Sequence, residues 1–156
     1  MKINFNGYFY KNEKQKAIEA SSIFGKHYKI SEKFYFTVHS VTKNKSQSLN
    51  KDYFKKNKPT DVLSFPLYKN YNSLLKLDPN REEDLGDMFI VRSIVKRNAE
   101  NYQKLFVEEL QYIIIHGLMH LIGYSHNKEI ELREVENKIM KTVSYTHLTL
   151  PTTPYV

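Results

Sequence analysis

The chain has 156 residues, no cysteine, 26% charged residues and a formal net charge of +7. The length fits one domain, and the lack of cysteine excludes disulfide frameworks, disulfide-linked partners, cysteine-bound metals and thiol nucleophiles. No apolar stretch reaches the roughly 20 residues needed to cross a bilayer, and residues 1–10 lack a secretory signal, so we expect a cytoplasmic protein with no membrane partner. The basic excess favours nucleic acid as a partner, although AT-rich coding also produces lysine-rich chains.

The spacing of apolar residues predicts alternating strands and helices. In chain order, we expect a strand at Lys2–Phe5, a helix at Glu13–Phe24, a strand at Lys33–Val41, a helix at Ser46–Phe54 and a strand at Asp61–Leu67. A loop at Tyr68–Glu83, a strand at Leu85–Val91, and helices at Ser93–Gln103, Phe106–Ile122 and Glu129–Lys141 follow. This order indicates the α+β class, with a small mixed sheet packed with helices as an αβα sandwich.

Residues 1–142 are predicted to form a single domain, and residues 143–156 a non-native or disordered tail. Residues 144–156 carry no acidic or basic side chain apart from His147, although the preceding chain is rich in charge. A translated cloning or sequencing artefact would explain that break in composition, and a genuine flexible C-terminus is the alternative.

Three of the six histidines fall within eleven residues, at His116, His120 and His126. Positions i and i+4 of an α-helix share one face, so His116 and His120 present two imidazoles to one point. Gly123 is suited to end that helix in a left-handed conformation, which lets His126 turn back toward the same point. Three neutral imidazoles and one water form the open tetrahedral site of catalytic zinc, so we predict one Zn²⁺ per chain.

The same histidine spacing matches the ligand frame of metzincin proteases. Those enzymes need a glutamate directly after the first histidine as the base that activates water. Gly117 occupies that position here, and glycine cannot move a proton. The ligand frame is therefore present without the part specific to a peptidase.

Residues 116–126, HGLMHLIGYSH, resemble the signature of the YbeY endoribonucleases, the bacterial rRNA maturation factors, whose pattern is H-G-x-L-H-L-x-G-Y-D-H. Leu49-Asn50 followed by residues 58–66, KPTDVLSFP, resembles that family's second block. Residues 85–90, LGDMFI, resemble its L-G-D-I strand. The three blocks occur in the family's order and span most of the predicted domain.

This resemblance implies a zinc-dependent, single-strand-specific endoribonuclease that acts in ribosomal RNA maturation and ribosome quality control. Its partners would be ribosomal RNA and ribosomal particles. The implied reaction is hydrolysis of a phosphodiester by a metal-activated water. Asp61 and Asp87 are candidate proton-transfer groups if their strand ends lie near the metal; the alternative is that both hold turns or backbone amides.

The chain departs from the family pattern at two positions. Ser125 stands where the family usually has aspartate beside the third histidine, a residue that could orient a ligand. Phe54 stands where the family usually has arginine, which would suit phosphate binding. Nearby lysines would supply charge there, but not a bidentate fork.

Residues 43–58 contain six lysines against the single acid Asp52. The lysines expected to bind RNA are Lys51, Lys55, Lys56 and Lys58. Tyr53 and Phe54 lie among them and could stack on unpaired bases. The alternative is a solvated helix face with Leu49 and Tyr53 turned toward the core.

Other residues are predicted to be structural. We expect Phe34, Phe36, Phe65 and Phe89 in the core, and Ile130, Val135 and Ile139 on the inner face of the last helix. The glutamates of that helix are predicted to be exposed and paired with basic neighbours: Glu129, Glu131, Glu134 and Glu136.

Two other functions stay open. One is a metzincin-like metallopeptidase, which the glycine at position 117 disfavours. The other is a ribosome-associated factor with a structural metal and weakened nuclease activity, which the replacements at positions 54 and 125 allow.

Overall fold

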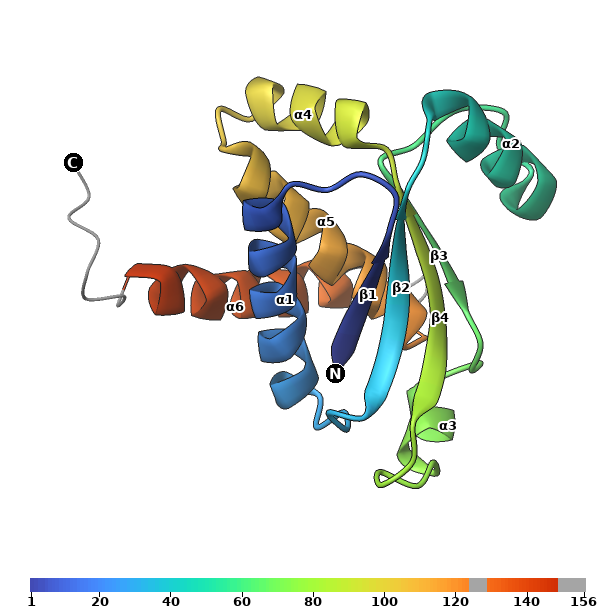
Figure 1. Cartoon of the computed structure of the whole chain (residues 1–156), viewed down its shortest axis with the longest axis vertical. Coiled ribbons are helices and arrows are strands. Elements are labelled where there is room, and N and C mark those ends of the chain that lie inside the picture. The colour runs from blue at the N-terminus through green and yellow to red at the C-terminus, as the bar shows by residue number, and fades with distance from the viewer. Residues whose placement is uncertain (124–128, 149–156) are drawn as a thin grey trace.

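The structure, a computed structural model, describes residues 1–123 and 129–148 and contains a four-stranded sheet flanked by helices (Figure 1). The strands are β1 Lys2–Asn6, β2 Phe34–Ser40, β3 Val62–Pro66 and β4 Glu83–Ile90. The helices are α1 Lys11–His27, α2 Lys43–Phe54, α3 Tyr71–Leu75, α4 Arg92–Asn101, α5 Phe106–Leu121 and α6 Glu129–Leu148. The α+β class predicted from the sequence is confirmed. None of the helices in these ranges is long and apolar enough to cross a membrane.

Two segments differ from the predicted elements. The expected loop at Tyr68–Glu83 contains the short helix α3, whose N-cap Asn70 accepts a hydrogen bond from the Ser73 backbone. The last helix was expected to end at Lys141, but α6 continues to Leu148, and Val143 is only 2% exposed. Residues 149–156 lie outside the described ranges, so the proposed foreign origin of the tail stays a prediction.

The sheet has the strand order β1-β2-β4-β3 and is mixed. Strand β1 runs parallel to β2, and β2 runs parallel to β4. Strand β3 is antiparallel to β4 and pairs Val62 with Ile90 and Pro66 with Gly86. Strand β3 therefore forms one edge of the sheet, next to α5.

Helices α1, α5 and α6 lie on one side of the sheet (Figure 1). Alternate residues of β2 face them, so Phe34, Phe36 and Val38 are at most 4% exposed. Helix α5 is apolar nearly all round and supplies fully buried side chains such as Ile114 and Leu118. Burial of each such side chain contributes about 1.5–3 kcal/mol, so α5 is anchored along much of its length.

The opposite face of the sheet lacks a full helical layer, which corrects the predicted αβα sandwich. Among the described helices, α2 and the short α3 lie at opposite ends of the sheet in this view, and neither spans this face (Figure 1). The side chains of β2 that point there, Tyr35, Thr37 and His39, are half-buried. Because these side chains tolerate contact with water, this face does not need a covering helix.

Phe65 and Phe89 lie on this open face and are half-buried, so their assignment to the core was wrong. Alternation explains their position, since their neighbours Ser64 and Met88 point toward α5. Their rings contact each other edge to face with centroids 5.4 Å apart. Hydrophobicity alone could not tell which face of the sheet they occupy.

Candidate metal centre

Helix α5 brings two of the three predicted metal ligands together at its C-terminal end. The Nε2 atoms of His116 and His120 are 3.2 Å apart, and the ring centroids are 4.7 Å apart. This arrangement follows from the i, i+4 spacing, which stacks the two side chains on one face of the helix. The predicted convergence of these two imidazoles is confirmed.

The two nitrogens fit a zinc ion. Two ligands at about 2.0–2.1 Å from a tetrahedral zinc lie roughly 3.3 Å apart, close to the observed separation. His126, the third predicted ligand, lies outside the described residues, as does Ser125. Within residues 1–123 and 129–148 no group of three possible ligands occurs, so the three-histidine set stays a prediction.

A buried carboxylate on α6 fixes the orientation of His116. Glu136 is 1% exposed, and its Oε1 accepts a hydrogen bond of 2.5 Å from His116 Nδ1. With the proton held on Nδ1, Nε2 carries the ring's lone pair, which is the tautomer in which an imidazole binds a cation through Nε2. Carboxylate–histidine pairs of this kind orient metal ligands and raise their basicity.

Tyr112, one turn before His116 on α5, binds the same carboxylate. Its hydroxyl donates to Glu136 Oε2 at 3.1 Å. Burial, followed by the negative charge of Glu136, raises the pKa of Tyr112 to about 12. The hydroxyl therefore stays protonated and keeps donating at neutral pH, which leaves both carboxylate oxygens of Glu136 hydrogen-bonded.

The exposed, ion-paired role predicted for Glu136 was wrong. The position of Glu136 in the sequence could have indicated its burial, because it falls in the same helical stripe as the buried Leu132, Ile139 and Val143. A glutamate in an apolar stripe needs a buried partner, and His116 supplies one. Ile130, which was expected to point inward, is 79% exposed.

Gly117 allows α5 to approach the sheet closely. A Cβ atom at this position would lie 2.6 Å from Met88 Cε and 2.8 Å from Met88 Sδ. Ser64 Oγ on β3 donates to the Gly117 carbonyl at 2.8 Å. The residue that replaces the metzincin glutamate is therefore a packing position between α5 and the sheet.

Gly123 ends the helix as predicted. Its φ of +109° lies in the region that favours glycine, and its backbone N–H donates to the His120 carbonyl. A Cβ there would lie 2.6 Å from Asn70 Cα, so the turn also packs against the chain before α3. The segment that contains His126 follows this turn and lies outside the described residues.

A cleft of about 540 Å³ opens in front of the histidine pair. Its walls come from α2, the connection that follows α2, strand β3 and α5. The lining residues are Asn50, Phe54, Lys56, Lys58, Thr60, Asp61, Val62, Leu63, Ser64, Pro66, His116 and His120. The cleft thus combines two imidazoles with basic and aromatic side chains.

The two candidate carboxylates lie in different places. Asp61 lines the cleft, where its side chain accepts hydrogen bonds from Thr60 Oγ1 and Asn98 Nδ2. Asp87 is not among the lining residues and instead bonds His39 Nε2 at 2.8 Å on the open face of the sheet. Of the two, only Asp61 shares a cavity with the histidine pair.

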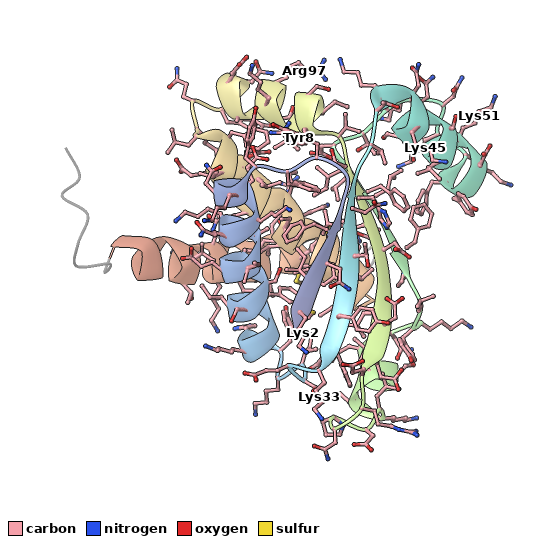
Figure 2. The ribbon with its side chains drawn as sticks, viewed as in Figure 1. Lys2, Tyr8, Lys33, Lys45, Lys51 and Arg97 are labelled. Carbon is pink, nitrogen blue, oxygen red and sulfur yellow. The ribbon has the colours of Figure 1, made fainter. Side chains whose placement is uncertain are left out.

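The four lysines predicted to bind RNA are all exposed, and two of them line the cleft. Lys56 and Lys58 face the cavity that holds the histidines, whereas Lys51 lines a separate depression. Lys55 ends α2 in a left-handed conformation with φ 58°. Figure 2 shows Lys51 on α2, at the side of the molecule away from α1.

Two buried polar side chains hold the connection between α2 and β3 in place. Asn50 Nδ2 donates to the Lys58 carbonyl at 2.9 Å. Ser46 Oγ both donates to the Thr60 carbonyl and accepts from the Thr60 N–H. These bonds fix the segment that carries Lys56 and Lys58, which gives a physical reason for the asparagine of the Leu49-Asn50 motif.

The endoribonuclease YbeY family matches residues 4–146 of the chain. The endoribonuclease YbeY of Buchnera aphidicola is 38% identical over 112 residues, covering 70% of this chain and 68% of that protein. The Staphylococcus carnosus protein of the same name is 37% identical over 107 residues, covering 69% of each chain. That of Lactobacillus helveticus is 33% identical over 112 residues, which span 67% of this chain but only 64% of the relative.

The fold is also similar to a solved structure. The solution structure of a Thermotoga maritima protein superposes with a TM-score of 0.61, covering 96% of this chain and 93% of that one at 22% identity. At this identity the likeness concerns the fold alone. The family match over residues 4–146 spans all three sequence blocks, and the chain belongs to the YbeY endoribonuclease family.

Proposed function

We propose that the chain is a zinc-dependent endoribonuclease that cleaves single-stranded RNA during ribosomal RNA maturation and ribosome quality control in the cytoplasm. The observation that carries this proposal is the pair of imidazole nitrogens 3.2 Å apart in a cleft lined by lysines. Relatives that share the family are named endoribonucleases, which supports RNA as the substrate. The proposed partners are ribosomal RNA and ribosomal particles.

His116, His120 and His126 would hold the zinc ion. When bound, zinc supplies Lewis acidity, which activates water and polarises a phosphoryl oxygen. Glu136 keeps the proton of His116 on Nδ1, so that Nε2 stays directed toward the cleft. Helix α6 packs against α5 and carries the buried Glu136, so the contact between the two helices orients His116.

The remaining lining residues suit a phosphodiester substrate. Lys56 and Lys58 offer positive charge to the phosphates from the wall formed by the connection after α2. Among the described lining residues Asp61 is the one carboxylate, and we propose it as the group that accepts a proton. The carboxylate of Asp87, held by His39 outside the cleft, takes no part in this proposal.

The experiment compares the full chain with its His120→Ala variant in three assays: bound metal, cleavage of single-stranded RNA and cleavage of casein. We expect about one zinc per wild-type chain, RNA cleavage without casein cleavage, and loss of both zinc and RNA cleavage in the variant. RNA cleavage at full rate in metal-free His120→Ala would overturn the metal mechanism. Casein cleavage without RNA cleavage would favour a metallopeptidase, and bound metal with neither activity would favour a ribosome-associated binding factor.

A further inference from the structure

Phe54 lies at the junction between the histidine cleft and the open face of the sheet. It lines the cleft and is 46% exposed. Its ring rests against that of Phe65, with centroids 5.5 Å apart and planes at 42°. A large ring held in this exposed position serves no packing need of the core, because much of its surface faces water.

Tyr53 lies beside Phe54 and is held by the same neighbour. It is 66% exposed, and its ring meets Phe65 edge to face with centroids 5.1 Å apart. The prediction that Tyr53 could point into the core is therefore wrong. Phe65 is in turn supported by Phe89 on β4. Tyr53, Phe54 and Phe65, termed the aromatic platform below, thus form a fixed group with two exposed rings.

The charges around the aromatic platform identify its occupant. Exposed lysines precede and follow it in the chain at Lys51, Lys55, Lys56 and Lys58, and Asp52 is the single acid between residues 43 and 58. Exposed rings flanked by cations suit single-stranded nucleic acid, whose bases stack on rings while its phosphates meet the lysines. Asp87 lies opposite Phe65 in the pairing of β3 with β4 and bonds His39 Nε2, so its carboxylate would repel phosphates from that side of the platform and leave the lysine side to the RNA backbone.

We propose that Phe54 and Tyr53 stack on unpaired bases of single-stranded RNA next to the scissile phosphate and position that strand in the histidine cleft. This inference rests on the proposed function, because the strand it describes is the substrate of the same site. Phe54 cannot pair with a phosphate as an arginine would, and its ring contributes base stacking instead. The four lysines then supply the contacts to the backbone.

The test uses the full chain and a hydrolysis-resistant, phosphorothioate-linked oligouridylate, together with the same backbone lacking its bases. Phe54→Leu keeps apolar contact with Phe65 but removes the aromatic face, and Phe54→Trp retains such a face. Tyr102→Ala is the matched control, because Tyr102 is also 66% exposed but lies at the end of α4. The Kd of each protein for each of the two oligomers is measured at one fixed salt concentration. Thermal melting verifies that each variant folds.

Stacking of one base typically supports about tenfold or more in affinity. We therefore expect Phe54→Leu to raise the Kd for oligouridylate about tenfold, with Phe54→Trp and Tyr102→Ala close to wild type. The Kd for the base-free backbone should not change in any of these variants. Tyr53→Ala should behave like Phe54→Leu with a smaller effect.

Three outcomes would overturn the inference. An unchanged Kd in Phe54→Leu would remove the stacking role while leaving the proposed nuclease in place. Equal weakening for oligouridylate and the base-free backbone would show that Phe54 acts on the backbone or the fold rather than on bases. Failure of the wild-type chain to bind oligouridylate at all would overturn both this inference and the proposed function.

Discussion

Helix α5 is buried over most of its length, whereas α2, on the other side of the same cleft, buries only Ser46 and Asn50. The imidazoles come from the buried helix and the lysines from the exposed one and its connection. Packing holds α5, whereas hydrogen bonds to the following connection hold α2. Metal ligands need fixed geometry, while contacts to a flexible polyanion tolerate motion, so each helix suits the groups that it carries.

The largest effect is expected from Gly117→Glu, which would insert the missing metzincin base into α5. The new side chain would collide with Met88 and place a carboxylate in the core, so we expect the free energy of unfolding to fall by about 3 kcal/mol or more. Urea unfolding measures this loss. Ile130→Glu, at a site that is 79% exposed, is the control and should change little. A stable Gly117→Glu variant that cleaves casein would contradict the packing role of Gly117.

The support that α6 gives to α5 is tested by Glu136→Gln. Glutamine is similar in size but lacks the carboxylate charge that bonds His116, and loss of such a partner typically weakens a metal ligand, so we expect zinc affinity to fall about 10- to 100-fold. Competition with a chromophoric chelator gives the affinity. Tyr112→Phe removes the other hydrogen bond to the same carboxylate and should have a smaller effect. Unchanged zinc affinity in Glu136→Gln would mean that Glu136 does not orient a ligand.

On the α2 side, Asn50→Ala removes the side-chain amide of Asn50, so the Lys58 carbonyl loses the hydrogen bond that this amide donates to it. The expected loss is about 1–2 kcal/mol of unfolding free energy. Asn44→Ala is the matched control, because Asn44 is an exposed asparagine of the same helix. Equal stability of the two variants would show that the connection is held by other contacts.

The smallest effect is expected from substitutions that remove only a positive charge from the wall of the cleft. Lys56→Gln and Lys58→Gln should leave stability unchanged but weaken RNA binding and lower its salt dependence. Each lost phosphate contact reduces the slope of log K against log salt by about 0.7 for a single strand. Binding isotherms over a salt series measure the slope, with Lys26→Gln on α1 as control. A slope identical to that of the wild type would exclude both lysines from the RNA contact.

The helical parts of the site were the most predictable from sequence. The i, i+4 spacing of His116 and His120 and the left-handed turn at Gly123 depend on local geometry, and the structure has both. Glu136 was misassigned because a glutamate near basic residues indicates an exposed face, and only its position among buried residues of α6 shows otherwise.

Features that depend on contacts distant in sequence could not be predicted. The strand order places β3 at the edge beside α5, and no local pattern encodes that order. Phe65 and Phe89 have strand periodicity, but nothing in their own segments shows that their face of the sheet stays open. The link between Asn50 and Lys58 depends on how the connection folds back on α2.

The central claim is that the converging nitrogens of His116 and His120, together with His126, hold a zinc ion. X-ray absorption at the zinc edge of the zinc-loaded full chain tests it most directly. We predict one zinc with three imidazole nitrogens at about 2.0–2.1 Å, and a change in that ligand set when His120 or His126 is replaced by alanine. A wild-type chain that binds no zinc, or a zinc environment that is the same after both substitutions, would contradict the account.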